Sequence, residues 1–298
     1  MNELRFDDKV AVVTGAGGGI GRAHALLLAS RGARVVVADL GCEIDGTGSS
    51  PDPANGVVRE IEARGGVAVA SHASVADEEG AASIVATALD AFGRLDVVIN
   101  NAGIFAPGPF ETLSSAQFRS MFDVHFFGTL FMTKAAWPHL IDAGSGRIVN
   151  TTSESFLGMD LLSSYGSAKA AIFGLTRNVA VAGDPHGIAA NCISPRAGTR
   201  MGIAHSVAMK MPPEVTEQAA ALMPPEAIAP AGAYLAHASC ALNGETFFVG
   251  PNHISRLAVI NTCGIKGETI SPETIAERLD EIMDTADAQV TDVHTRLT

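Results

Sequence analysis

Tyr165 and Lys169 are the residues of this chain whose types and spacing most directly indicate chemistry. They stand four residues apart in Tyr165-Gly166-Ser167-Ala168-Lys169, so on a helix they would share one face and could act as a proton-transfer pair. A tyrosine is protonated at neutral pH, and the ammonium of Lys169 is expected to lower its pKa toward that of a usable base. Ser153, twelve residues before Tyr165, could donate a hydrogen bond to a carbonyl or a developing alkoxide. The three side chains predict an enzyme.

A glycine-rich stretch, Thr14-Gly15-Ala16-Gly17-Gly18-Gly19-Ile20-Gly21, follows an apolar run near the start of the chain. Between a strand and a helix, its backbone amides and the helix dipole could face the pyrophosphate of a dinucleotide. We therefore expect Gly15, Gly19, Ile20 and Gly21 to bind a cofactor. A glycine-rich turn is a weak signal by itself, because the same residues could simply form a tight turn.

Asp39 ends the second expected strand, eighteen residues after Gly21, and Leu40 follows it; both are expected to bind the cofactor. A carboxylate there could accept hydrogen bonds from the adenosine ribose and repel a 2'-phosphate, which predicts NAD rather than NADP. The alternative for Asp39 is a solvated strand end.

Two later strand ends should face the same cofactor. The stretch Asn100-Asn101-Ala102-Gly103 would bring Asn101, Ala102 and Gly103 against it, although it could also be only a turn. Ser74 and Val75, after the third strand, are expected near the adenine ring.

Short β-branched runs alternate with helical stretches along the chain, which predicts a parallel sheet covered on both faces. The expected strands are residues 10–14, 34–39, 67–71, 95–100, 147–151, 189–194 and 246–249. With right-handed crossovers they give a single-domain α/β Rossmann fold, a doubly wound seven-stranded parallel sheet with helices on both faces and a C-terminal extension. We assign residues 1–262 to this domain, with a loop over 41–56 and a substrate lid over 196–232, and residues 263–298 to the extension, with a helix over 272–283 capped by Ser271.

The composition narrows the class of partner. The 298 residues carry a net charge of -12 and are 47% hydrophobic, which argues against nucleic acid or an anionic membrane and for a small-molecule ligand. Four widely spaced cysteines predict neither a disulfide framework nor a metal site. The charged start is no signal peptide and no apolar run approaches a membrane span, so we expect a cytoplasmic protein.

Taken in order, Thr14 to Gly21, Asn100 to Gly103, Ser153, Tyr165 and Lys169 resemble the short-chain dehydrogenase/reductase family. The resemblance covers nearly the whole chain. It implies that Tyr165 exchanges a proton with the substrate oxygen while hydride moves to or from a nicotinamide, with Lys169 also bonding the nicotinamide ribose. The positive ring of oxidised nicotinamide is expected to lower the pKa of Tyr165 together with Lys169. It further implies a homo-oligomer, a dimer or tetramer, with helices over 115–141 and 165–181 at the interface.

The chain departs from the family pattern near the catalytic residues. Counting back from Tyr165 by the usual family spacing gives Thr152, whereas alignment through the strand over 146–150 gives Ser153, which we prefer; Ser155 is a weaker alternative. His125 stands where the family usually has an asparagine of a proton relay. It could hold the same water, or it could be a hydrogen-bonded helix residue without a catalytic role.

Beyond the catalytic residues, Pro195-Arg196-Ala197-Gly198-Thr199-Arg200-Met201 resembles the dehydrogenase part of peroxisomal multifunctional enzymes. This implies cofactor contacts by Pro195 and Thr199 and a bulky hydrophobic alcohol or ketone as substrate, of the (3R)-hydroxyacyl-CoA or hydroxysteroid type. Arg196, Arg200 and Lys210 are candidate cations for the phosphates of coenzyme A.

Two other function classes remain as hypotheses. A non-catalytic NAD(H)-binding sensor or scaffold would keep the glycine-rich turn without needing the polar triad. A hydrolase with Ser153 as nucleophile would need a Gly-x-Ser-x-Gly elbow, which the sequence lacks.

Overall fold

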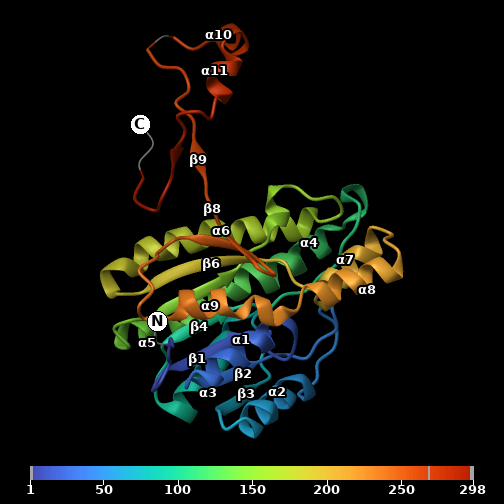
Figure 1. Ribbon diagram of the computed structural model, residues 1–298, viewed down its shortest axis with the longest axis vertical. Coiled ribbons are helices and arrows are strands. Elements are labelled where there is room, and N and C mark those ends of the chain that lie inside the picture. The colour runs from blue at the N-terminus through green and yellow to red at the C-terminus, as the bar shows by residue number, and fades with distance from the viewer. Residues whose placement is uncertain (1–2, 268, 296–298) are drawn as a thin grey trace.

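The computed structural model describes residues 3–267 and 269–295. Eight strands form one sheet in the order β3-β2-β1-β4-β5-β6-β7-β8 (Figure 1). Their bounds are β1 Val10–Thr14, β2 Arg34–Ala38, β3 Val67–Ser71, β4 Val97–Asn100, β5 Arg147–Thr151, β6 Ala189–Pro195, β7 Thr246–Gly250 and β8 His253–Leu257. The first seven are parallel, and they match the seven predicted strands to within two residues at either end.

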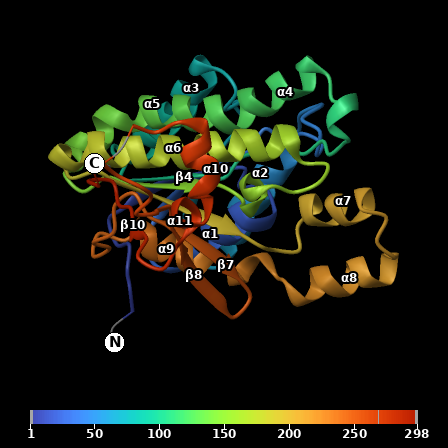
Figure 2. The same cartoon turned by 90° about the horizontal axis from the view of Figure 1, so that it is seen from above.

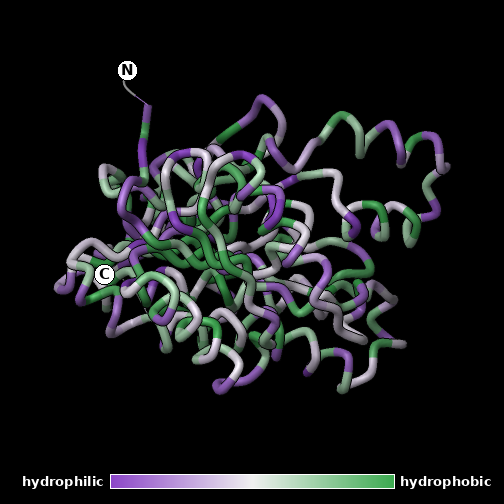
Figure 3. Tube along the Cα trace, turned by 90° about the horizontal axis from the view of Figure 1, so that it is seen from below, coloured by the Kyte–Doolittle hydropathy of each residue, from purple (hydrophilic) through white to green (hydrophobic). Residues whose placement is uncertain are grey.

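Two apolar layers cover the sheet because alternate residues of each strand point to opposite faces. In β1, Ala11 and Val13 pack on one face and Val10 and Val12 on the other. The first face is covered by helices α1 (Gly19–Ser30), α2 (Asp52–Ala63) and α9 (Ala229–Ala236), and the second by α3 (Glu78–Phe92), α5 (Gly128–Asp142) and α6 (Ser163–Gly183). The hydrophobic strands run through the middle of the molecule in Figure 3. This is the predicted doubly wound α/β fold.

The strand order reverses at β1, which pairs with β2 on one side and β4 on the other. The connections after these strands leave toward opposite faces, so a crevice opens at their carboxyl ends. The glycine-rich turn after β1 and the Asn101 turn after β4 meet at this crevice.

The predicted count of seven strands is wrong by one. Strand β8 turns back after Gly250 and pairs antiparallel with β7. Most of its residues are exposed, so it lacks the apolar pattern that identified the other strands. The tight turn is made possible by Asn252, whose φ is +56°, a left-handed conformation that asparagine tolerates better than most residues.

Several helical segments also differ from expectation. The predicted loop over 41–56 already contains the start of α2 at Asp52. The predicted helix over 115–141 is α4 (Ser115–Phe122), a π-helical turn over Asp123–Phe127, and α5. The segment over 196–232 holds helices α7 (Arg200–Ala208) and α8 (Pro213–Leu222), which project to one side of the domain in Figure 2.

The C-terminal segment stands away from the sheet (Figure 1). It contains the strand pair β9 (Ile260–Asn261) and β10 (Gln289–Val290) and the helices α10 (Pro272–Glu277) and α11 (Leu279–Met283). Ser271 caps α10, as expected, by accepting a hydrogen bond from the amide of Thr274. The predicted single helix over 272–283 is broken at Arg278, whose φ and ψ of -114° and 25° are not helical. The domain boundary at 262 stays a prediction, and residues 296–298 of the extension lie outside the described residues.

Candidate active site

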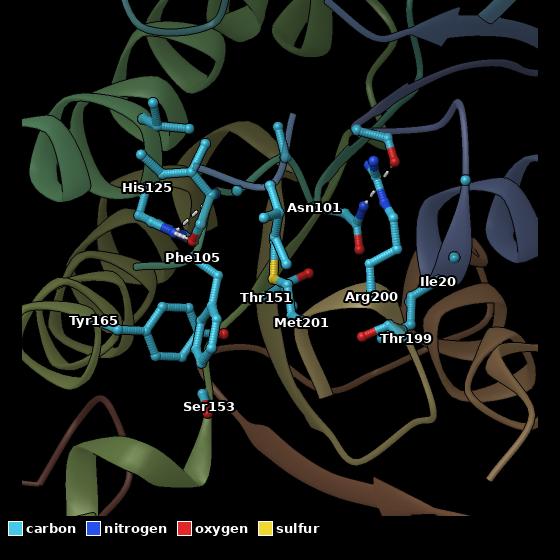
Figure 4. A pocket seen from close by; sticks show the side chains of 18 of the residues that line it. Ile20, Asn101, Phe105, His125, Thr151, Ser153, Tyr165, Thr199, Arg200 and Met201 are labelled. Carbon is cyan, nitrogen blue, oxygen red and sulfur yellow. Dashed lines mark hydrogen bonds between the residues drawn. The ribbon is translucent and has the colours of Figure 1, made fainter. Parts of the chain in front are cut away.

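A cavity of about 340 Å³ opens at the carboxyl ends of β1, β2, β4, β5 and β6. The structure brings both groups of predicted residues to its wall. The predicted residues that line it are Gly15, Gly19, Ile20, Asp39, Leu40, Ser74, Val75, Asn101, Ala102, Gly103, His125, Ser153, Tyr165, Lys169, Pro195 and Thr199. Figure 4 shows Ile20 and Thr199 on one side of it and Ser153, Tyr165 and His125 on the other.

The glycine-rich turn is shaped by contacts that leave no room for side chains. A Cβ on Gly15, whose φ is +63°, would lie 2.7 Å from the Cα of Ala102, and a Cβ on Gly21 would lie 2.1 Å from the carbonyl oxygen of Gly15. Gly21 therefore packs the first turn of α1 onto the loop and, among the predicted cofactor residues, is the one that does not line the cavity. Helix α1 begins at Gly19 with its free amides toward this turn, as an anion site requires.

Asp39 connects the second strand to the glycine-rich turn. Its two carboxylate oxygens accept hydrogen bonds of 2.7 Å each from the amides of Gly17 and Gly41. Each oxygen keeps a further acceptor position, since a carboxylate offers about four. The alternative of a merely solvated strand end is wrong for the geometry, because the carboxylate is bound by the backbone and lines the cavity. The glycine-rich turn and this carboxylate fit a dinucleotide.

Asn101 ties β4 to β1. Its side-chain amide donates to the carbonyl oxygens of Thr14 and Gly15 at 3.0 and 3.2 Å, and the Thr14 hydroxyl accepts hydrogen bonds from the amides of Asn101 and Ala102. Asn101 thus holds the glycine-rich turn in place in addition to lining the cavity. Ser74 accepts a hydrogen bond from the amide of Ala76, which fixes the turn after β3.

Tyr165 and Lys169 lie on α6 and face the cavity, as their spacing predicts. Lys169 is 3% exposed, and its Nζ donates to the carbonyl oxygen of Thr151 at 2.7 Å. Burial lowers the pKa of Lys169 to about 8. The Nζ lies 5.5 Å from the centre of the Tyr165 ring.

The expected lowering of the Tyr165 pKa is wrong for the chain by itself. Burial raises this pKa to about 12, and the cause that opposes the rise is a hydrogen bond from Ser153. The removal of the phenolate from water raises the pKa by more than the hydrogen bond from Ser153 lowers it. A phenolate at neutral pH would need a further positive charge.

Of the three candidate hydroxyls, Ser153 is the one that the structure directs to Tyr165. The Thr152 hydroxyl donates to the carbonyl oxygen of Lys169 at 2.7 Å, so it is already occupied. The Ser155 hydroxyl is buried and does not line the cavity. The catalytic role of Ser153 stays a prediction that this geometry favours.

His125 lies in the π-helical turn, is 1% exposed, and packs edge-on against Tyr165 with 5.2 Å between ring centres. Its Nε2 lies 2.8 Å from the carbonyl oxygen and 3.2 Å from the amide nitrogen of Ile104, so it donates to the oxygen in one tautomer and accepts from the amide in the other. The Nδ1 is buried without a hydrogen-bond partner in the described part of the chain. Burial and the charge of Lys169 hold the pKa of His125 well below its usual value, so the ring is neutral.

Sequence reasoning missed a charged pair on the cavity wall. Glu154 and Arg196, next to Ser153 and Pro195, form a two-pronged ion pair with distances of 2.7 Å from Nη2 to both carboxylate oxygens. Arg196 is therefore neutralised, and Lys210 does not line the cavity, whereas Arg200 does. An arginine and a glutamate far apart in sequence carry no signal that they will meet.

Sequence reasoning also missed other parts of the wall. Cys42, Glu43 and Ile44, in the loop after Asp39, line the cavity, as do Phe105 and His205. None of them belongs to a recognisable pattern, because tertiary contacts position the loops and the helix α7 that carry them.

Within residues 3–267 and 269–295, no cluster of three histidine, cysteine or acidic side chains is arranged to hold a metal ion. None of the helices in these ranges combines the length and apolar character needed to cross a membrane.

Comparison with known proteins gives a consistent set of matches. The family model described as short chain dehydrogenase matches residues 9–207. A protein of Mycobacterium tuberculosis described as a short-chain type dehydrogenase/reductase is 42% identical over 95% of this chain and 96% of its own length. Peroxisomal multifunctional enzyme type 2 of Mus musculus is 39% identical over 96% of this chain, which spans 38% of that enzyme.

A solved structure adds a bound cofactor to the comparison. The 7α-hydroxysteroid dehydrogenase complexed with NADH and 7-oxo glycochenodeoxycholic acid has a TM-score of 0.72 and 29% identity. The match covers 84% of this chain and 97% of that one.

Proposed function

Because the chain belongs to the short-chain dehydrogenase/reductase family, we propose that it is an NAD-dependent oxidoreductase that interconverts a secondary alcohol and a ketone on a bulky hydrophobic substrate. The substrate is of the hydroxysteroid or (3R)-hydroxyacyl-CoA type. Tyr165 is the acid and base of the reaction.

One observation carries the proposal: a single cavity holds the glycine-rich turn and Asp39 together with Ser153, Tyr165 and Lys169. A dinucleotide in this cradle would extend from the carboxyl end of β2 toward α6. Its reactive end would then reach the only part of the described cavity wall where a phenol, a hydroxyl and an ammonium stand together. Such convergence of polar groups in one pocket is the usual mark of an active site.

Tyr165, Ser153 and Lys169 each have a separate role in alcohol oxidation. When bound, NAD would accept a hydride and, through its cationic ring, supply the further positive charge that a phenolate needs. Tyr165 takes the proton of the substrate hydroxyl, and Ser153 donates a hydrogen bond to the oxygen on which charge changes. The buried Lys169, held by the carbonyl of Thr151, adds positive charge beside the phenol.

The preference for NAD rests on Asp39. Its carboxylate is fixed by two backbone amides, so it cannot turn away from a cofactor. A 2'-phosphate beside a fixed carboxylate is repelled, whereas ribose hydroxyls can donate to it. NADH in the related hydroxysteroid dehydrogenase supports this choice.

The substrate class is inferred from two kinds of relative. The resemblance of residues 195–201 to the dehydrogenase part of peroxisomal multifunctional enzymes favours an acyl thioester, and the hydroxysteroid dehydrogenase complex favours a fused-ring alcohol. The neutralisation of Arg196 by Glu154 weakens the case for coenzyme A phosphates at that part of the wall.

The test is turnover of NAD and of NADP with hydroxysteroids, 3-hydroxyacyl-CoA thioesters and alicyclic alcohols, followed by the absorbance of the reduced nicotinamide. Tyr165→Phe should lower kcat at least about 100-fold, the usual minimum for loss of a general base. Tyr234→Phe is the matched control, because Tyr234 is 39% exposed on α9 and does not line the cavity. Turnover that survives in Tyr165→Phe would overturn the mechanism, and failure to bind either dinucleotide would overturn the function.

Assembly and location are part of the proposal. We infer a homo-oligomer, a dimer or tetramer, because exposed apolar side chains stand on α6 and on the C-terminal segment: Val181, Leu279 and Met283. Light scattering of the purified chain tests this, and a monomer at micromolar concentration would contradict it. The cytoplasmic location stays a prediction from the sequence, which imaging of the tagged protein would check.

A further inference from the structure

Phe105 lies between the catalytic tyrosine and the segment that carries α7. It follows the Asn101 turn, lines the cavity and is 5% exposed. Its ring stands edge-on to Tyr165, with 5.3 Å between ring centres and planes at 80°. The two rings therefore pack directly, and Tyr165 presents one side to Phe105.

The opposite neighbour of Phe105 comes from α7. The ring centre of His205 lies 6.3 Å from that of Phe105, again with nearly perpendicular planes. Figure 4 shows Phe105 between Tyr165 and Met201, another residue of α7 that lines the cavity. The Phe105 ring thus lies near both Tyr165 and α7.

The backbone of Phe105 is fixed. Its amide donates to the carbonyl oxygen of Ile44 at 2.7 Å, which ties it to the loop after Asp39. The Tyr165 ring also packs edge-on against His125, with 5.2 Å between ring centres. Tyr165 therefore contacts two rings, and the anchored backbone of Phe105 leaves its side chain as the part that can turn.

We propose that Phe105 is the specificity-determining residue of the site: its ring is the wall beside the reacting carbon and holds Tyr165 in place against His125. This inference rests on the proposed function. A cyclic alcohol without a free alkyl branch next to the carbinol carbon can lie along this aromatic wall and bury apolar surface against it. A free alkyl branch at that position meets the ring and is excluded. Alicyclic alcohols that lack such a branch, called flat below, are then preferred.

The experiment compares kcat/KM for a flat alicyclic alcohol and for an analogue with a branched group beside the carbinol carbon. Phe105→Ala should raise the branched-to-flat ratio at least about tenfold, equivalent to about 1.4 kcal/mol. Phe105→Leu keeps most of the apolar volume and should give a smaller rise. Phe110→Ala is the matched control, since Phe110 is 70% exposed and does not line the cavity. An unchanged ratio in Phe105→Ala, with turnover retained, overturns the proposal and leaves the proposed function standing.

A second readout needs no substrate. The chain has two tyrosines, so the tyrosinate absorbance of Tyr165 is obtained by subtracting the titration of Tyr165→Phe. If Phe105 shields Tyr165 from water, Phe105→Ala should lower the pKa of Tyr165 by at least about one unit, because burial is the cause that raises it. NADH binding, measured by fluorescence, checks that each variant is folded. An unchanged titration in a folded variant overturns the shielding, even if no alcohol is turned over.

Discussion

The Nζ atom of Lys169 lies 2.7 Å from the carbonyl oxygen of Thr151 and donates a hydrogen bond to it. Thr151 ends β5, and Lys169 lies two turns into α6. The bond therefore joins the strand that leads to Ser153 with the helix that carries Tyr165. Only 3% of Lys169 is exposed, so the ammonium is held away from water. This burial lowers the free energy of unfolding, but it places a positive charge in the site.

Replacing Lys169 by Met should abolish turnover and raise stability at neutral pH. Below about pH 8, the folded pKa, the ammonium is charged in both the folded and unfolded chains, so its full desolvation cost is present. Removing it should raise Tm by about 2–4 °C, the shift that about 1 kcal/mol gives in a domain of this size class. Thermal unfolding monitored by circular dichroism measures this.

The pH dependence of the free energy of unfolding tests the same burial cost of Lys169. Between about pH 8 and 10.5, Lys169 binds more protons in the unfolded chain than in the folded one. Its contribution to the free energy of unfolding of the wild type therefore rises with pH over this range. The rise should be absent from Lys169→Met, and Lys134→Met, a change at an exposed lysine, should retain it. A Lys169→Met protein that is less stable than wild type at pH 7 would contradict the cost of burial.

Replacing Ser153 by Ala should move the pH profile of alcohol oxidation to higher pH. The Ser153 hydrogen bond opposes the rise in the Tyr165 pKa, so its loss makes the phenolate harder to form, and oxidation requires the phenolate as base. The measurement is kcat/KM against pH with saturating NAD. Ser155→Ala removes a buried hydroxyl away from the cavity, so it should leave the pH profile unchanged. An unchanged pH profile in Ser153→Ala would show that Ser153 does not lower the pKa of Tyr165.

Replacing Gly103 by Ala should destabilise the chain by about 1–3 kcal/mol, because an added methyl group overpacks a filled site. Its Cβ would lie 2.4 Å from Cε1 of His125, and that ring is held by Ile104. Denaturant unfolding measures the loss. The double variant with His125→Asn, compared with His125→Asn alone, should show a smaller effect of the methyl group; equal effects in both backgrounds would show that the ring is not the obstacle.

Replacing Asp39 by Asn should reduce the preference for NAD over NADP by at least about tenfold, because each 1.4 kcal/mol of lost repulsion changes a binding ratio by that factor. The readout is the ratio of the two dissociation constants, measured by fluorescence of the reduced cofactors. Asp45→Asn is the control, since Asp45 lies in the same loop but binds Thr47 and does not line the cavity. If the ratio stays constant, Asp39 shapes the turn without selecting the cofactor.

The local features of the fold could be predicted from the sequence because they depend on neighbouring residues. Seven strands follow from short apolar runs, and the shared face of Tyr165 and Lys169 follows from helical spacing. The glycine-rich turn is equally local, since the close approach of Gly21 to Gly15 excludes any side chain.

The rest was decided by tertiary structure. An ion pair such as Glu154 with Arg196 and a ring contact such as Phe105 with His205 join segments that are far apart in the chain. The pKa of Tyr165 also could not be read from the residues around it in sequence, because the dominant effect is burial by groups from several elements. Residue types and spacing therefore determined which groups are available for catalysis, whereas packing determined their protonation and which substrates can reach them.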